Sequence, residues 1–209
     1  MNVVRYVLLL LSVVTLLGTG PELGLGQRSP SVVARRISVR PDSRVWLEGS
    51  SNVRDWTCKA TAMEATIDVA ETPAVAGSYP AVSGALVKVP VRMLKCGDRH
   101  MEAHMYTALK APKEGAPTFI VADLDGLPIT DGVIRTLEVS GRLSIAGVER
   151  PIRINVLGDK LPDGTLRARG TLPILMTDFG ITPPRPWGGI LKTANKVLIQ
   201  FEIFVDPIQ

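Results

Sequence analysis

The chain has 209 residues, a formal net charge of +4, 45% hydrophobic residues and 5% aromatic residues. This length accommodates one domain of ordinary size plus a processed segment. Its positive charges are scattered and do not form a basic stripe interleaved with aromatic side chains, so the composition argues against a nucleic-acid-binding protein.

The first 26 residues have the pattern of an export signal. Arg5 precedes an apolar run over residues 7–17, and Gly20 and Gly26 are the candidate cleavage positions. The run is shorter than the ~20 apolar residues of a membrane-spanning helix, so we expect cleavage rather than a permanent anchor. We therefore predict a signal peptide (1–26), a linker (27–36) and one domain (37–206) that is periplasmic or secreted, with no stable membrane span after cleavage.

Alternation of apolar and polar residues predicts antiparallel strands over most of this domain. It runs over residues 85–93, 136–145, 152–156 and 197–205. Residues 146–149 and 161–165 have turn-forming sequences, and each is expected to join two strands. Pro90 lies on the polar side of the first run and lacks an N–H, so that strand is expected to be an edge or to be interrupted there. Many short strands with this spacing indicate an all-β barrel or sandwich.

Cys58 and Cys96 are the only two cysteines. An even number in an oxidising compartment predicts a disulfide, and the alternative is a pair of buried free thiols.

Residues 98–110 interrupt the alternation with a helical pattern. Met101, Met105 and Leu109 recur at helical spacing, and Asp98 is suited to cap the N-terminus. We expect one short helix lying against the barrel, across a seam or mouth.

His100 and His104 share one face of this predicted helix, a spacing that can chelate a divalent metal. A zinc site needs at least one further ligand, and Glu102 points away from that face. The sequence also contains no nucleophile elbow and no glycine-rich phosphate loop. We therefore predict no metal site, no cofactor and no enzymatic activity.

Three motifs carry a family resemblance. They are Gly49-x-Ser51-x-x-x-Asp55-Trp56, Met101-x-x-His104-Met105-x-x-Ala108-Leu109 and Thr177-Asp178-Phe179-Gly180-Ile181. Their order and spacing, from about Ser38 to Val205, resemble the YceI-like family of secreted bacterial lipid-binding barrels. Arg54 stands where relatives often carry His, so no role of that histidine is transferred to this chain.

The resemblance implies a closed antiparallel lipocalin-like β-barrel of about eight strands with one short helix, holding a long apolar chain, typically a polyisoprenoid. From strand alternation we predict the residues that line its interior: Val87, Val89, Val91, Leu137, Val139, Leu143, Ile145, Ile154, Phe201 and Ile203. The expected partner is an isoprenoid or other long-chain lipid, and the protein is expected to be a monomer or homodimer.

Two alternative functions remain open from the sequence. One is an envelope stress or interaction protein with a packed core that acts through its surface. The other is a secreted metal-dependent enzyme that uses His100 and His104.

Overall fold

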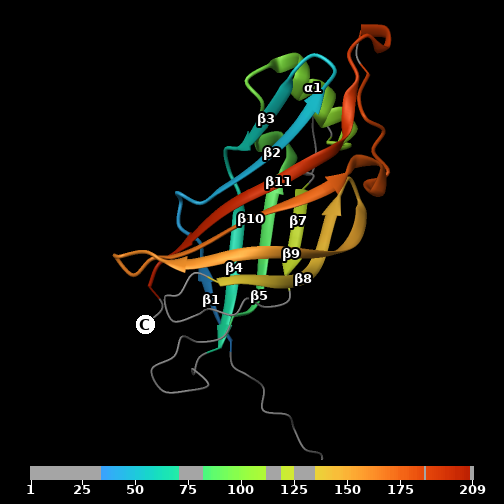
Figure 1. Cartoon of the computed structure of the whole chain (residues 1–209). Helices are drawn as coiled ribbons and strands as arrows, with labels where there is room; N and C mark the ends of the chain where they lie inside the picture. Colours follow the sequence, from blue (N-terminus) through green and yellow to red (C-terminus); the bar gives the residue numbers. More distant parts are fainter. Residues whose placement is uncertain (1–33, 71–81, 112–118, 125–134, 186, 208–209) are drawn as a thin grey trace, which may run out of the picture. The chain divides into compact units, whose positions relative to one another are not determined.

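The computed structural model of the chain describes residues 34–70, 82–111, 119–124, 135–185 and 187–207 (Figure 1). The predicted signal peptide and most of the predicted linker lie outside these ranges. Within them the strands are β1 (Ala34–Ser38), β2 (Arg44–Ser51), β3 (Asp55–Ala60), β4 (Glu64–Ala70), β5 (Val82–Pro90), β6 (Leu94–Lys95), β7 (Phe119–Leu124), β8 (Arg135–Ile145), β9 (Val148–Lys160), β10 (Leu166–Leu175) and β11 (Thr193–Val205). The first strand begins at Ala34, inside the segment that the sequence suggested as linker.

All of these strands belong to one antiparallel sheet, in the order β1-β4-β5-β7-β8-β9-β10-β11-β2-β3-β6. Ile67 on β4 and Ile203 on β11 are far apart in this order, yet they line the same cavity, so the sheet curls around its apolar face. The antiparallel lipocalin-like class with one helix is thereby confirmed. The described ranges contain eleven strands rather than about eight, because some are short segments such as the two-residue β6.

The β8–β9 hairpin follows directly from the sequence pattern. Val139, Leu143 and Ile145 are buried, whereas the residues that alternate with them on β8 are mostly exposed. Ile145 pairs with Val148 across a two-residue turn in which Ala146 and Gly147 have φ angles of 53° and 83°. Positive φ at both central residues is the geometry of a type I′ turn, whose twist matches that of the flanking strands.

Pro90 ends a strand that the alternation had extended to Met93. β5 stops at Pro90, and the 3₁₀ turn η1 (Val91–Met93) follows. β5 pairs with β4 on one side and β7 on the other, so the proline marks an interruption rather than a sheet edge. The expectation that Val91 and Met93 continue the apolar strand face is wrong, because proline has no N–H with which to continue the ladder.

The predicted helix is confirmed as α1 (Arg99–Ala108), at the same end of the sheet as the β2–β3 turn (Figure 1). The Asp98 carboxylate caps it by accepting the N–H groups of His100 at 2.9 Å and Met101 at 3.0 Å. The hydroxyl of Tyr106 donates to the Leu94 carbonyl at 2.9 Å and so joins the helix to β6. Within the described ranges, no helix has the length and apolar character needed to cross a membrane.

The Cys58–Cys96 disulfide is present and joins β3 to the segment that precedes α1. Cys58 is fully buried, and the Cys96 N–H donates to a carboxylate oxygen of Glu102 at 3.0 Å. A covalent bond and a charged hydrogen bond therefore hold the start of the helix against the sheet.

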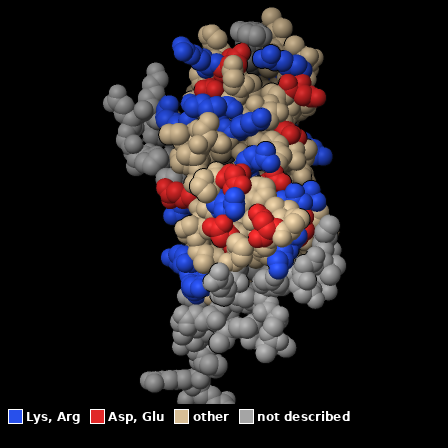
Figure 2. All heavy atoms as spheres, turned by 90° about the vertical axis from the view of Figure 1, so that its left-hand side faces the viewer, with Lys and Arg blue, Asp and Glu red and all other residues tan. Residues whose placement is uncertain are grey.

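Charged side chains are interspersed on the face shown in Figure 2, where Lys and Arg lie among Asp and Glu. Ion pairs also join neighbouring strands, such as Arg44 with Glu202 and Arg36 with Asp68. This arrangement matches the scattered charge of the sequence.

Candidate functional site

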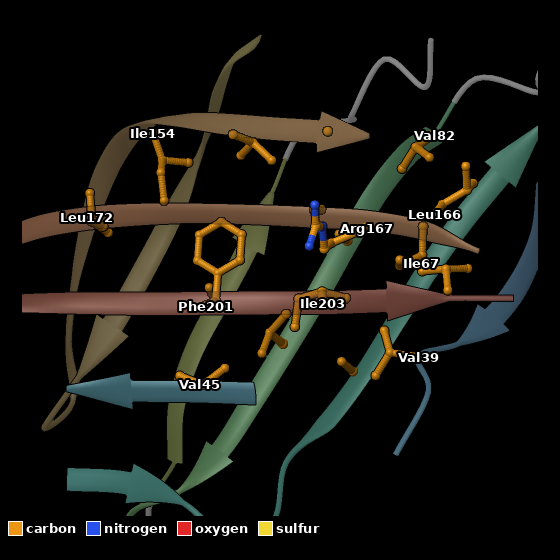
Figure 3. A pocket seen from close by; sticks show the side chains of 18 of the residues that line it. Val39, Val45, Ile67, Val82, Ile154, Leu166, Arg167, Leu172, Phe201 and Ile203 are labelled. Carbon is orange, nitrogen blue, oxygen red and sulfur yellow. The ribbon is translucent and has the colours of Figure 1, made fainter. Parts of the chain in front are cut away.

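An apolar cavity of about 160 Å³ lies inside the curled sheet. The labelled side chains in Figure 3 come from strands on both sides of it and are mostly aliphatic. Seven of the residues predicted to line the interior border this cavity: Val87, Val89, Leu137, Leu143, Ile154, Phe201 and Ile203.

Small residues on β9 and β10 keep this cavity open. Gly158 pairs with Ala168, and both border the cavity. A Cβ atom built on Gly158 would meet no heavy atom within 4 Å, so this position faces open space. Gly170 behaves oppositely, since a Cβ atom there would lie 2.7 Å from the ring of its cross-strand partner Phe201. Gly170 thus makes room for the ring of Phe201, whereas Gly158 leaves a gap.

The other three residues that were predicted to line the interior do not border this cavity. Val139 and Val91 are 2% and 1% exposed and belong to the hydrophobic core, outside the set of residues that line the cavity. Ile145 lines a second cavity. Alternation identified the buried face of each strand correctly. Whether a residue on that face borders the cavity or is packed in the core depends on side chains from other strands.

Sequence reasoning missed part of the wall. Val45 and Ile67 border the cavity and lie on alternating strands, so the same signal was available for them. Val39 also borders the cavity, but it lies between β1 and β2, where no strand pattern marks it.

The second cavity has a volume of about 240 Å³ and lies between α1 and the adjacent end of the sheet. Met101, Met105 and Leu109 line its helical side, and Ile174 and Val197 are among the strand residues that line it. Ile199 borders both cavities. As expected, the helix lies across an end of the curled sheet.

The motif around Gly49 and Trp56 builds one wall of this second cavity. The two residues are direct partners across β2 and β3, and a Cβ atom on Gly49 would lie 2.1 Å from the Trp56 ring. Only glycine therefore lets the indole lie flat across β2. Ser51 fixes the intervening turn, because its hydroxyl accepts the N–H groups of Val53 and Arg54 at 3.2 Å and 3.1 Å.

Two charged residues, Asp159 and Arg167, border the first cavity. They are strand partners, and the guanidinium of Arg167 donates to both carboxylate oxygens of Asp159, at 3.0 Å from Nε and 2.5 Å from Nη2. The hydrogen bonds from Arg167 lower the pKa of Asp159, against the effect of burial. The carboxylate is therefore held in its charged form.

Asp159→Asn should lower the free energy of unfolding at pH 7 by about 1–3 kcal/mol, because it removes the carboxylate that accepts two hydrogen bonds from the part-buried Arg167 guanidinium and leaves only Glu202, at 3.7 Å, as its charged partner. The pKa of Asp159 is lower in the folded chain than in the unfolded chain, where it is roughly 3.9, so its ionised form stabilises the fold above that pH. This stability is lost as the pH falls through the lower pKa of the folded chain. The difference from wild type should thus shrink when urea unfolding is measured at about pH 3 instead of pH 7.

Asp123→Asn is the matched control, since Asp123 pairs with Arg142 where both side chains are about half exposed. This change should cost less than about 1 kcal/mol. An Asp159→Asn protein as stable as wild type at pH 7, or one whose deficit is the same at both pH values, contradicts the prediction.

His100 and His104 both line the second cavity, together with Arg54 and Asp98. No group of three or more His, Cys, Asp or Glu side chains suited to hold a metal occurs among the described residues. The absence of a metal site stays a prediction.

A curled antiparallel sheet with an apolar interior and a helix at one end defines a lipocalin-like barrel domain. The model of the YceI-like domain matches residues 42–205, and the chain belongs to that family. A comparison with curated proteins gives no match.

Solved structures with the same fold include BcnA of Burkholderia cenocepacia, with 19% identity, a TM-score of 0.58, and 80% of this chain and 99% of that chain covered. A polyisoprenoid binding domain from Saccharophagus degradans, implicated in plant cell wall breakdown, has 12% identity, a TM-score of 0.59, and coverage of 82% and 98%. The YceI protein of Campylobacter jejuni has 17% identity, a TM-score of 0.52, and coverage of 77% and 85%.

Proposed function

We propose that this protein is an exported binding protein that holds a single-chain apolar lipid of the polyisoprenoid class inside its sheet, and that it has no catalytic activity. In this proposal residues 1–26 are removed on export and the domain acts in the periplasm or outside the cell. The observation that carries the proposal is the first cavity, whose wall is built mainly from aliphatic side chains.

The energetics favour a long apolar chain. Each buried CH₂ contributes ~0.8 kcal/mol, so about a dozen carbons supply roughly 10 kcal/mol before the cost of association. Each cavity alone is smaller than the roughly 300–1,000 Å³ of common ligand pockets, and the two together fall within that range. A chain that passes Ile199 would reach both cavities.

Two further observations support the choice of ligand class. The structure from Saccharophagus degradans with the same fold is described as a polyisoprenoid binding domain. The open position at Gly158 also favours a ligand-holding interior over the solid core of a purely surface-acting protein.

Native mass spectrometry of the exported protein tests this function. We expect a fraction of the molecules to carry one adduct of lipid mass, and organic extraction should release that lipid. Titration of the stripped protein with farnesol should then show saturable binding. Protein that carries no lipid and shows no saturable binding of farnesol or hexadecanol contradicts the proposal.

A further inference from the structure

The second cavity has more polar residues at its border than the first, where Asp159 and Arg167 are bonded to each other. Leu47, Ile145 and Val197 are among the apolar residues of its wall. Arg54, Asp98, His100 and His104 also border it. The side chains of Arg54 and Asp98 are 66% and 42% exposed, and both histidines are exposed, so this polar rim lies where the cavity meets solvent.

The backbone fixes both sides of this rim. Arg54 lies in the β2–β3 turn, where its N–H and C=O groups are both bound by the Ser51 hydroxyl, at 3.1 Å and 2.9 Å. The two histidines lie one turn apart on α1, whose start is held by the disulfide and by the Asp98 cap. Turn and helix are separate in sequence, and the fold brings them to one opening.

The side chains of the rim offer an anion more hydrogen-bond donors than acceptors. Asp98 is the rim's carboxylate, and one of its oxygens, Oδ1, accepts the N–H groups of His100 and Met101. The Arg54 guanidinium forms an ion pair with Asp98 Oδ2 at 3.7 Å, a separation longer than a hydrogen bond. A guanidinium offers five N–H donors in a fork that matches phosphate and carboxylate oxygens, and each imidazole offers at least one more donor.

We propose that this rim binds an anionic head group, so that the ligand is an amphiphile with a phosphate or carboxylate at the α1 end and its apolar chain directed past Ile199 into the first cavity. This inference rests on the proposed function and adds to it the polarity, charge and orientation of the ligand. An amphipathic cavity with donors at its mouth and aliphatic side chains at its base favours such a molecule over a wholly apolar one.

Paired ligands with identical tails test the head group. Dissociation constants are measured for farnesyl phosphate and farnesol, and for hexadecanoate and hexadecanol. We expect at least one anion to bind roughly tenfold more tightly than its alcohol, a difference of about 1.4 kcal/mol. The pair with the larger ratio identifies phosphate or carboxylate as the preferred head.

Arg54→Gln should reduce this anion-to-alcohol ratio severalfold, and the alcohol of each pair serves as the internal reference. Arg153→Gln is the matched control, because Arg153 is an exposed arginine on β9 outside both cavities. The control should keep the wild-type ratio.

Each outcome bears on one proposal. Equal affinities for anion and alcohol, or a ratio that Arg54→Gln leaves unchanged, overturn the head-group proposal while the binding function stands. Failure of all four ligands to bind contradicts the proposed function itself.

Discussion

Gly158→Phe is expected to weaken lipid binding roughly tenfold or more while the sheet stays folded, a loss of at least about 1.4 kcal/mol of binding free energy. Gly158 borders the first cavity, and a side chain there would project into space that no heavy atom occupies within 4 Å of its Cβ. Its φ angle lies outside the positive range, so a larger residue introduces no backbone strain. The phenyl ring should therefore occupy the volume that the lipid tail needs.

The measurement is a titration with farnesol, combined with urea unfolding to confirm the fold. Asn155→Phe is the matched control, since Asn155 is exposed on the same strand and lies outside both cavities. It should bind as wild type does. If Gly158→Phe is folded and binds farnesol with wild-type affinity, the first cavity does not hold the ligand.

Loss of the Cys58–Cys96 bond is expected to lower the free energy of unfolding by about 4 kcal/mol, within the range seen for native disulfides. The bond joins residues 38 positions apart, and in the chain-entropy model opening a loop of this size restores much conformational freedom to the unfolded chain. The loss is a large share of the roughly 5–15 kcal/mol that stabilises a domain. The bond also holds the start of α1, so its loss should loosen the wall of the second cavity.

Urea unfolding of the wild type with and without a reducing agent, beside the Cys58→Ala, Cys96→Ala double variant, measures this effect. The reducing agent should destabilise the wild type and leave the double variant unchanged. Quantitative labelling of both thiols in exported, unfolded protein, or an unfolding midpoint that reduction does not shift, contradicts the prediction.

The sequence by itself determined the features that depend on neighbouring residues. The β8–β9 hairpin follows from a period of two on either side of Ala146 and Gly147, and α1 follows from its Asp98 cap and helical spacing. The disulfide follows from the presence of only two cysteines behind a predicted export signal. The hairpin and the helix depend on local backbone geometry, and the disulfide needs only the fact that each cysteine has one possible partner.

Tertiary structure decided which buried residues meet empty space. Leu137 and Val139 lie on the same face of one strand, yet Leu137 borders the first cavity whereas Val139 is packed in the core. The difference comes from side chains that other strands place above each residue, and the period of one strand contains no information about them.

The sequence pattern also could not show that the polar residues at the border of the second cavity lie together. Arg54 and Asp98 are 44 positions apart, and the histidines appeared in the sequence only as an incomplete metal site. The curl of the sheet and the disulfide bring the β2–β3 turn and α1 to one opening. Because long-range packing sets this proximity, only the folded chain shows that these residues share a cavity.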